Sequence, residues 1–215
     1  DKFRPDQLKI YPCQVIEDSP LAKTYKLIGF KPYNEKQTRE IISEMMKLIP
    51  NYCRVMRVMR EFPKEKLIEG VERVDLRKDV EDDLRNSEVK ISEIRMREIG
   101  FNKDNLMADS NLKLRITKYN SCGGKEFFLE FVNDDEILFG LLRLRLSKRA
   151  MIRELHVYGQ ALNLGEKGSK EIDSQHRGLG KMLMKKAEEI VMENNYNEIS
   201  VISGIGVREY YRKLG

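Results

Sequence analysis

The chain has 215 residues, of which 40% are hydrophobic and 35% charged, and its mean hydropathy is −0.56. At ~150 residues per domain, this length predicts one domain or two. No window approaches the ~18 uninterrupted apolar residues that a membrane helix needs, and residues 1–5 carry no apolar signal sequence, so we expect neither a membrane protein nor a secreted one. The chain starts without Met and stops at Leu214-Gly215, and we expect a fragment of a longer protein.

Cysteine usage and net charge narrow the class of protein further. Cys13, Cys53 and Cys122 form no CxxC motif and no Cys/His pair, which argues against a zinc site and a disulfide framework. Unpaired thiols are typical of a reducing cytoplasm, where we expect the protein to act. The net charge of +5 is too mild an excess to predict a nucleic-acid partner by itself.

Basic residues gather in two stretches of the chain. Each stretch is either a solvated face or a surface for a polyanion. The first holds Arg54, Arg57 and Arg60, and the second holds Arg143, Arg145, Lys148, Arg149 and Arg153.

The first 75 residues have the pattern of a strand, a helix and a strand. Residues 8–16 are β-rich, and Pro12 makes them an imperfect strand or an edge strand. Residues 34–37 resemble a capping box and open a helix with one apolar face that ends at Pro50. Residues 53–60 alternate as a strand does. This order predicts a βαβ unit with parallel strands. Because one such unit cannot bury both faces of its strands, residues 1–75 look like the end of a larger α/β domain.

The rest of the chain predicts an α+β domain. Residues 76–93 are highly charged and read as a connector, in which Asp75 can cap a helix that carries Leu76, Val80 and Leu84. A helix over 178–194, a strand over 198–203 and a short helix over 207–214 close the chain. Before them come five strand-like segments joined by turn sequences that favour antiparallel neighbours: 91–99, 112–119, 126–132, 136–146 and 151–158.

A glycine-bearing segment opens the predicted helix over 178–194. Its sequence is Gln-His-Arg-Gly-Leu-Gly over 175–180, and Gly178 and Gly180 leave backbone N–H groups uncovered at the positive end of the helix. Such groups can hold a phosphate or a pyrophosphate. The spacing fits neither GxGxxG nor GxxxxGK[ST], which argues against a Rossmann site and a Walker site. The alternative is that the glycines only permit tight packing.

The strand over 151–158 breaks its alternation near its end. We expect the strand end to splay and to expose backbone groups that the amides of a ligand can pair with. Glu154 and His156 share one face and can form an acid/base pair or a polar pair. The alternative for His156 is a hydrogen bond within the fold. On the last helix, Tyr210 or Tyr211 either protonates a leaving thiolate or covers the core as a half-buried aromatic residue.

These segments together resemble GCN5-related N-acetyltransferases. The pattern is Q-x-x-G-x-G before a helix, then a strand, then Y-Y-R-K-x-G, within residues 94–215. A closer resemblance, to the family of Elongator catalytic subunits, rests on residues 153–159, 175–180, 141–145, 201–204 and 210–213. Residues 8–12 and 53–77 resemble the last part of that family's radical-SAM barrel. The resemblance predicts a GCN5-related acetyltransferase fold over 94–215, preceded by a C-terminal remnant of a radical-SAM α/β barrel over 1–75, with 76–93 as the connector.

The resemblance implies that the protein modifies the wobble uridine of tRNA at C5 and uses acetyl-CoA to do so. The chain would be the acetyltransferase part of a carboxymethyluridine synthase, and tRNA would stimulate its cleavage of acetyl-CoA. It also implies a homodimer or an Elongator-like assembly. The family uses S-adenosylmethionine and a [4Fe–4S] cluster, but the cysteines that would hold the cluster are not in this sequence, so we expect no radical step from this chain and no metal site. The alternatives are a protein lysine acetyltransferase and a nonenzymatic tRNA-binding module with a structural acetyl-CoA pocket.

The resemblance also suggests roles for individual residues. The backbone of residues 155–157 would pair with the pantetheine arm, and residues 175–180 would cradle the pyrophosphate. The catalytic candidates are Tyr211, which we favour as the proton donor, then Tyr210, Glu154 and His156. The cofactor-binding candidates are Glu154, Leu155, His156, Val157, Ser174, Gln175, His176, Arg177, Gly178, Leu179, Gly180, Tyr210 and Tyr211. The candidates for a basic surface that binds the tRNA backbone are Arg57, Arg60, Arg95, Arg97, Arg143 and Arg145.

Overall fold

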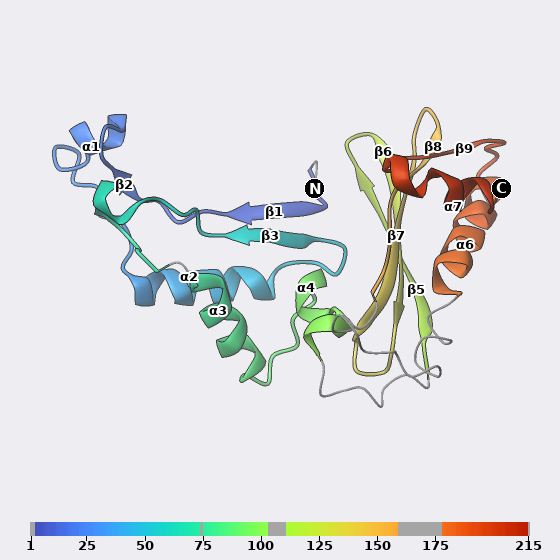
Figure 1. The fold of residues 1–215 in the computed structure, drawn as a ribbon, viewed down its shortest axis with the longest axis horizontal. Helices are drawn as coiled ribbons and strands as arrows, with labels where there is room; N and C mark the ends of the chain where they lie inside the picture. The colour runs from blue at the N-terminus through green and yellow to red at the C-terminus, as the bar shows by residue number, and fades with distance from the viewer. Residues whose placement is uncertain (1–2, 74, 103–110, 159–177, 215) are drawn as a thin grey trace. The chain divides into compact units, whose positions relative to one another are not determined.

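The computed structural model describes residues 3–73, 75–102, 111–158 and 178–214 (Figure 1). The chain forms two compact units: Asp6–Met96, and Arg97–Gly215 together with Asp1–Pro5. In the described part of the chain, no helix is both long enough and apolar enough to cross a membrane.

The first unit contains the predicted βαβ arrangement. Strand β1 (Gln7–Ile10) pairs in parallel with β3 (Arg54–Val58), and α2 (Glu35–Lys47) lies between them in the chain. The predicted capping box is confirmed, because Asn34 Oδ1 accepts from the Gln37 amide (2.9 Å) and Gln37 Oε1 accepts from the Asn34 amide (3.1 Å). The remaining short elements of this unit are β2 (Val15–Ile16), α1 (Pro20–Thr24), a 3₁₀ turn (Lys64–Lys66) and β4 (Leu67–Glu69), with β2 and β4 antiparallel.

The core of the first unit extends into the segment that the sequence suggested as a connector. Helix α3 (Leu76–Arg85) buries Leu76, Val80 and Leu84 in the same cluster as Ile42 of α2 and Val55 of β3. Asp75 precedes α3 as predicted, but its side chain makes no capping hydrogen bond. Residues 76–93 therefore lie inside the first unit, because their apolar stripe packs on α2 and β3.

The strand predicted over 91–99 is wrong. This segment forms the short helix α4 (Ile94–Arg97) and a 3₁₀ turn (Ile99–Phe101). The buried carboxylate of Glu93 sets the start of α4, accepting from the backbone amides of Met96 (2.9 Å) and Val55 (2.7 Å). The apolar alternation arises because Ile91 and Met96 are buried in the first core while Ile99 belongs to the second.

The second unit is a five-stranded sheet with a long helix on one face (Figure 1), as the sequence predicted. The strands lie in chain order, the first four are antiparallel, and the last pair is parallel. Helix α6 (Leu179–Glu193) packs on the sheet, and the 3₁₀ turn Ile205–Val207 leads into α7 (Arg208–Arg212). The strands are β5 (Lys113–Ser121), β6 (Gly124–Val132), β7 (Leu138–Leu146), β8 (Ala150–Val157) and β9 (Ile199–Val201).

The two faces of this sheet differ in chemistry. On the face that α6 covers, Phe127, Leu129 and Leu144 pack against Leu183 and Ala187. The opposite face, which we call the charged face, carries side chains that are largely buried and paired across the strands. They are Arg115, Glu126, Phe128, Glu130, Arg143, Arg145, Arg153 and Glu154.

Candidate active site

Strands β8 and β9 run together briefly and then separate. Their pairing covers Ala150–Ile152 of β8 and Ile199–Val201 of β9, and a last hydrogen bond joins the Ile202 amide to the Ile152 carbonyl (2.9 Å). Strand β8 continues to Val157, and no described residue of β9 pairs with it there. Among the described residues, the end of β8 is therefore unpaired on this side, in agreement with the splayed strand end that the broken alternation predicts.

A β-bulge at Arg153 lies where the two strands separate. Glu154 pairs with Arg143 of β7 and Ile152 pairs with Leu144, which leaves Arg153 as the extra residue. Ile152 and Leu155 both pack on the core under α6. Arg153 and Glu154 therefore both project from the charged face, and this is the physical cause of the irregular sequence pattern.

The backbone groups on the open side of β8 follow from the antiparallel ladder with β7. The Tyr158 amide donates to the Phe139 carbonyl (2.8 Å), and donors alternate between the two sides of a strand. The amides of Leu155 and Val157 accordingly point to the side that β9 has left, whereas that of His156 points to β7. Of the three backbone positions predicted to bind a ligand, two thus lie on the open edge.

The N-terminus of α6 is the second part of the site. Gly178 is the N-cap, and the first turn of the helix has no acidic residue, so its uncovered N–H groups can attract an anion. A β-carbon at Gly178 would meet no described residue within 4 Å. At Gly180 it would lie 2.5 Å from the Tyr210 hydroxyl and 3.6 Å from Cγ2 of Val157. Tyr210, the end of β8 and the first turn of α6 therefore meet at one place.

The two candidate tyrosines have different surroundings. Their rings are 5.3 Å apart and nearly perpendicular. Tyr211 packs against the core of the second unit, whereas Tyr210 is 40% exposed and places its hydroxyl at Gly180. Burial raises the pKa of both hydroxyls, so both stay protonated and able to donate at neutral pH. The sequence favoured Tyr211, whereas the hydroxyl that lies at Gly180, in the first turn of α6, is that of Tyr210.

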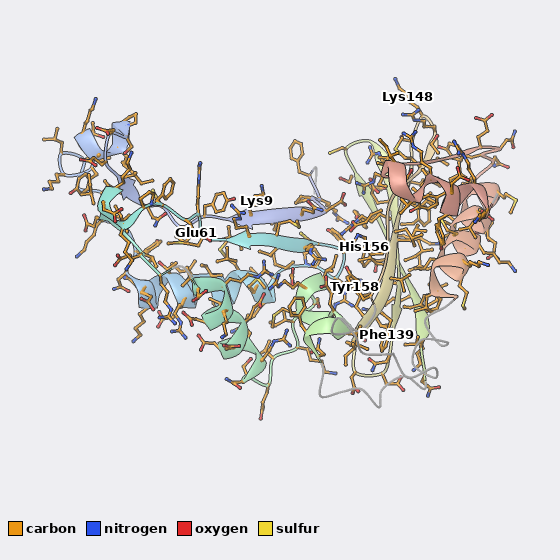
Figure 2. The ribbon with its side chains drawn as sticks, viewed as in Figure 1. Lys9, Glu61, Phe139, Lys148, His156 and Tyr158 are labelled. Carbon is orange, nitrogen blue, oxygen red and sulfur yellow. The ribbon has the colours of Figure 1, made fainter. Side chains whose placement is uncertain are left out.

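Glu154 and His156 share the charged face of β8, as predicted from their spacing. Glu154 is held in an ion pair, because its Oε2 accepts from Arg143 Nε (2.7 Å). His156 is exposed near the end of β8, with its ring centroid 5.8 Å from that of Tyr158 (Figure 2). His156 is thus the solvent-exposed member of the pair.

Four residues predicted to bind the cofactor, Ser174, Gln175, His176 and Arg177, lie outside the described residues. The predicted pyrophosphate cradle is therefore described from Gly178 onward.

Three of the arginines predicted to bind RNA are engaged within the charged face. Arg97 is 5% exposed and its Nη1 lies 2.8 Å from Glu130 Oε2. Arg143 is 2% exposed and pairs with Glu154, and Arg145 donates to Glu126 and to the carbonyls of Ser121 and Cys122 in the β5–β6 turn. This corrects the prediction for Arg97 and Arg143, because a buried guanidinium held by a carboxylate does not reach a phosphate.

The other three predicted arginines belong to the first unit. Arg95 lies 3.4 Å from Glu81. Arg57 and Arg60 are exposed, and the Arg60 guanidinium lies over the Phe62 ring at 5.1 Å.

Lys9 is a basic residue that sequence reasoning missed. It is exposed on β1 (Figure 2), and its Cα partner across the parallel pair is Arg57. Like charges directly opposite each other on a sheet are unfavourable, and no described carboxylate forms an ion pair with either residue. The alternation around Lys9 signals exposure, but only the register of β1 on β3 brings the two charges together.

The cysteines do not fit an iron–sulfur cluster. Cys53 is buried, Cys13 is exposed in the same unit, and Cys122 is exposed in the other unit, whereas a cluster is commonly held by about four thiolates. Among the described residues, no group of three or more His, Cys, Asp or Glu side chains is placed to hold a metal ion.

Comparisons with known proteins give matches that cover both units. Residues 5–86 match the family model described as Radical_SAM C-terminal domain. The chain is 39% identical to tRNA uridine(34) acetyltransferase of Methanocaldococcus infernus, over 99% of this chain and 42% of that protein. It is 34% identical to human Elongator complex protein 3, over 99% of this chain and 41% of that protein.

A solved structure of Elp3 from Methanocaldococcus infernus superposes with a TM-score of 0.81 at 36% identity, covering 98% of this chain and 53% of that one. The match confirms the predicted fold, an α+β acetyltransferase-type unit preceded by the C-terminal part of a radical-SAM domain. The chain spans less than half the length of these curated relatives. Along nearly its whole length, the chain belongs to the family of the tRNA uridine(34) acetyltransferases and Elongator complex protein 3.

Proposed function

We propose that the second unit is the acetyl-CoA site of an enzyme that modifies the wobble uridine of tRNA at C5, as the acyltransferase part of a carboxymethyluridine synthase. The observation that carries the proposal is the open edge of β8 beside the N-terminus of α6. That edge offers backbone donors to an extended amide chain, and the helix start offers donors to a diphosphate. The names of the relatives supply the substrate class.

Each part of the site has one role in this proposal. The amides at the start of α6 bind the pyrophosphate, and the backbone of Leu155 and Val157 pairs with the pantetheine arm. Acetyl-CoA supplies an activated acetyl group, and in the absence of a radical step water accepts it, giving acetate and coenzyme A. Tyr210 donates a proton to the departing thiolate, since its hydroxyl is protonated and lies at Gly180. His156 is the exposed acid or base on the charged face of β8, opposite the face that α6 covers.

The tRNA contact in this proposal lies on the first unit. Lys9, Arg57 and Arg60 are exposed cations, and a phosphate between Lys9 and Arg57 would relieve the repulsion across the two strands. We place the enzyme in the cytoplasm, acting as a homodimer or in an Elongator-like assembly. The radical chemistry of the family is not assigned to this chain, because its cysteines do not fit the cluster.

The test is coenzyme A release from acetyl-CoA by the purified chain, alone, with tRNA and with a control RNA of equal length. The proposal is supported if tRNA stimulates the release of coenzyme A and the control RNA does not. Acetyl transfer to a peptide without RNA identifies a protein lysine acetyltransferase instead. Binding of acetyl-CoA without release under any condition identifies a nonenzymatic module with a structural pocket.

A further inference from the structure

Two ion pairs, with partners on β7 and β6, hold the β-bulge of β8. We propose that Arg143 and Glu126 are positioning residues for the acyl-CoA site. Through Glu154 and Arg153 they fix the bulge, so that β8 leaves β9 after Ile152 and presents the backbone of Leu155 and Val157 to the pantetheine arm. This inference rests on the proposed function of the same site.

The bulge requires two successive side chains, Arg153 and Glu154, on one face of the strand. Without the extra residue, the alternation would turn Glu154 toward the core under α6 and move Leu155 to the charged face. An ionised carboxylate has no partner in that apolar core, so the sequence opposes the regular register. Attractive contacts on the charged face then decide how firmly the bulged register is held.

The first of these contacts is the pair between Arg143 and Glu154. The two residues are direct cross-strand partners, and Arg143 Nε lies 2.7 Å from Glu154 Oε2. The Arg143 guanidinium also stacks over Phe128 of β6 at 5.0 Å from the ring centroid. Because Arg143 is 2% exposed and held from both sides, it offers Glu154 a rigid partner.

The second contact reaches across β7. Arg153 Nη2 donates to Glu126 Oε2 (2.8 Å), while Arg145 Nη1 donates to the other oxygen of the same carboxylate (2.5 Å). The Glu126 side chain is 4% exposed, so its two arginine partners balance a charge that water hardly reaches. One carboxylate on β6 thus ties the bulge residue of β8 to β7.

The position of the bulge gives these contacts a functional consequence. The last hydrogen bond between β8 and β9 is accepted by Ile152, the residue directly before Arg153. A bulge bends its strand and increases the local twist, so the path of residues 154–157 is set there. Those residues form the open edge that would pair with the pantetheine arm.

The experiment measures acetyl-CoA affinity by calorimetry and coenzyme A release on the purified chain. Arg143→Met keeps much of the side-chain volume and removes the charge. We expect it to raise the Kd for acetyl-CoA by about 10-fold or more, because a small displacement of a binding edge costs this much. We expect KM to rise while kcat stays near the parental value, since Tyr210 and His156 remain. Arg143→Lys should recover part of the affinity.

A matched control separates positioning from stability. Arg115 lies on the same charged face, on β5, which β6 and β7 separate from β8, and it donates to Glu130 (2.7 Å). Arg115→Met should lower Tm and leave Kd unchanged. The variants Arg143→Met and Glu154→Gln should be non-additive in Kd, as expected of two residues that act through one contact.

Three outcomes would overturn the inference. The first is a folded Arg143→Met variant that binds acetyl-CoA as tightly as the parent. The second is an Arg115→Met variant that loses affinity to the same extent, because the effect would then be general. The third is a parent chain that does not bind acetyl-CoA at all, which overturns the proposed function as well and is distinguished because it appears before any substitution is made.

Discussion

The hydroxyl of Tyr210 lies against the backbone of Gly180, so close that a β-carbon on Gly180 would be 2.5 Å from it. Tyr210 belongs to α7, and Gly180 is in the first turn of α6. The absence of a side chain at position 180 therefore determines where this tyrosine can sit. Gly180, which the sequence predicted to leave its N–H group uncovered, thus also makes room for a side chain of the protein.

We expect Gly180→Ala to displace the Tyr210 hydroxyl and to slow coenzyme A release by about 10-fold, the scale of a small misplacement at a reacting centre. Alanine gains about 1 kcal/mol of helix propensity over glycine, which offsets the cost of moving a flexible side chain. Tm should therefore change little. Gly100→Ala is the control, because no described residue lies within 4 Å of the added carbon and Gly100 lies outside the proposed site. Equal rates for the two variants would contradict this account.

The two tyrosines can be separated by removing one hydroxyl at a time. Tyr210→Phe should slow coenzyme A release by about 10²-fold, the scale of losing a general acid, with acetyl-CoA affinity retained. Tyr211→Phe should release coenzyme A at close to the parental rate, since Tyr211 packs against the core. Steady-state kinetics of both variants decides the assignment, and the reverse result would return the role to Tyr211.

The pH profile of release should show the raised pKa of Tyr210. The ordinary tyrosine value is 10.0, and burial raises the pKa because it disfavours the phenolate. The donor is present below the raised pKa and is lost as pH increases through it, so kcat should not fall before pH exceeds about 10. Rates corrected for uncatalysed hydrolysis test this. Tyr210→Phe should lack the alkaline limb, and an identical limb in that variant would exclude Tyr210 as its source.

Arg57→Ala should weaken tRNA binding more at low salt than at high salt. Loss of one phosphate contact lowers the log–log salt slope by about 0.7–0.9. Lys36→Ala is the control, because Lys36 is equally cationic, highly exposed and situated beside Glu40 on α2. Fluorescence anisotropy with labelled tRNA at several salt concentrations measures both slopes. A slope that Arg57→Ala leaves unchanged would remove Arg57 from the interface.

Glu93→Ala should destabilise the first unit. The substitution leaves the buried amides of Val55 and Met96 without the carboxylate that accepts from them, at a cost of about 1–3 kcal/mol for each unsatisfied group. Burial raises the pKa of Glu93, so its ionised form is disfavoured in the folded state. Denaturant unfolding followed by circular dichroism measures the loss, with the exposed Glu88→Ala as control. Equal stability of the two variants would show that water replaces the carboxylate.

Local patterns in the sequence predicted most elements correctly. The Asn34 capping box, the parallel strands and the antiparallel meander are all present. The strand predicted over 91–99 is absent. A buried carboxylate and apolar residues that are buried in two separate cores give this segment the same alternation as a strand. The broken alternation near the end of residues 151–158 predicts a splayed strand end, and β8 does part from β9 there, although the cause, a bulge at Arg153, appears only in the register with β7.

The sequence by itself determined the two-part organisation, the glycine-bearing start of α6 and the resemblance that named the family, because these depend on residue types at short spacings. Only the tertiary structure decided which arginines are available to a ligand and which tyrosine hydroxyl lies at Gly180. Arg143 and Arg57 look alike in the sequence, but one is stacked on Phe128 and held by Glu154 while the other is exposed beside Lys9. The electrostatic role of a charged side chain depends on partners far along the chain, and no local pattern encodes them.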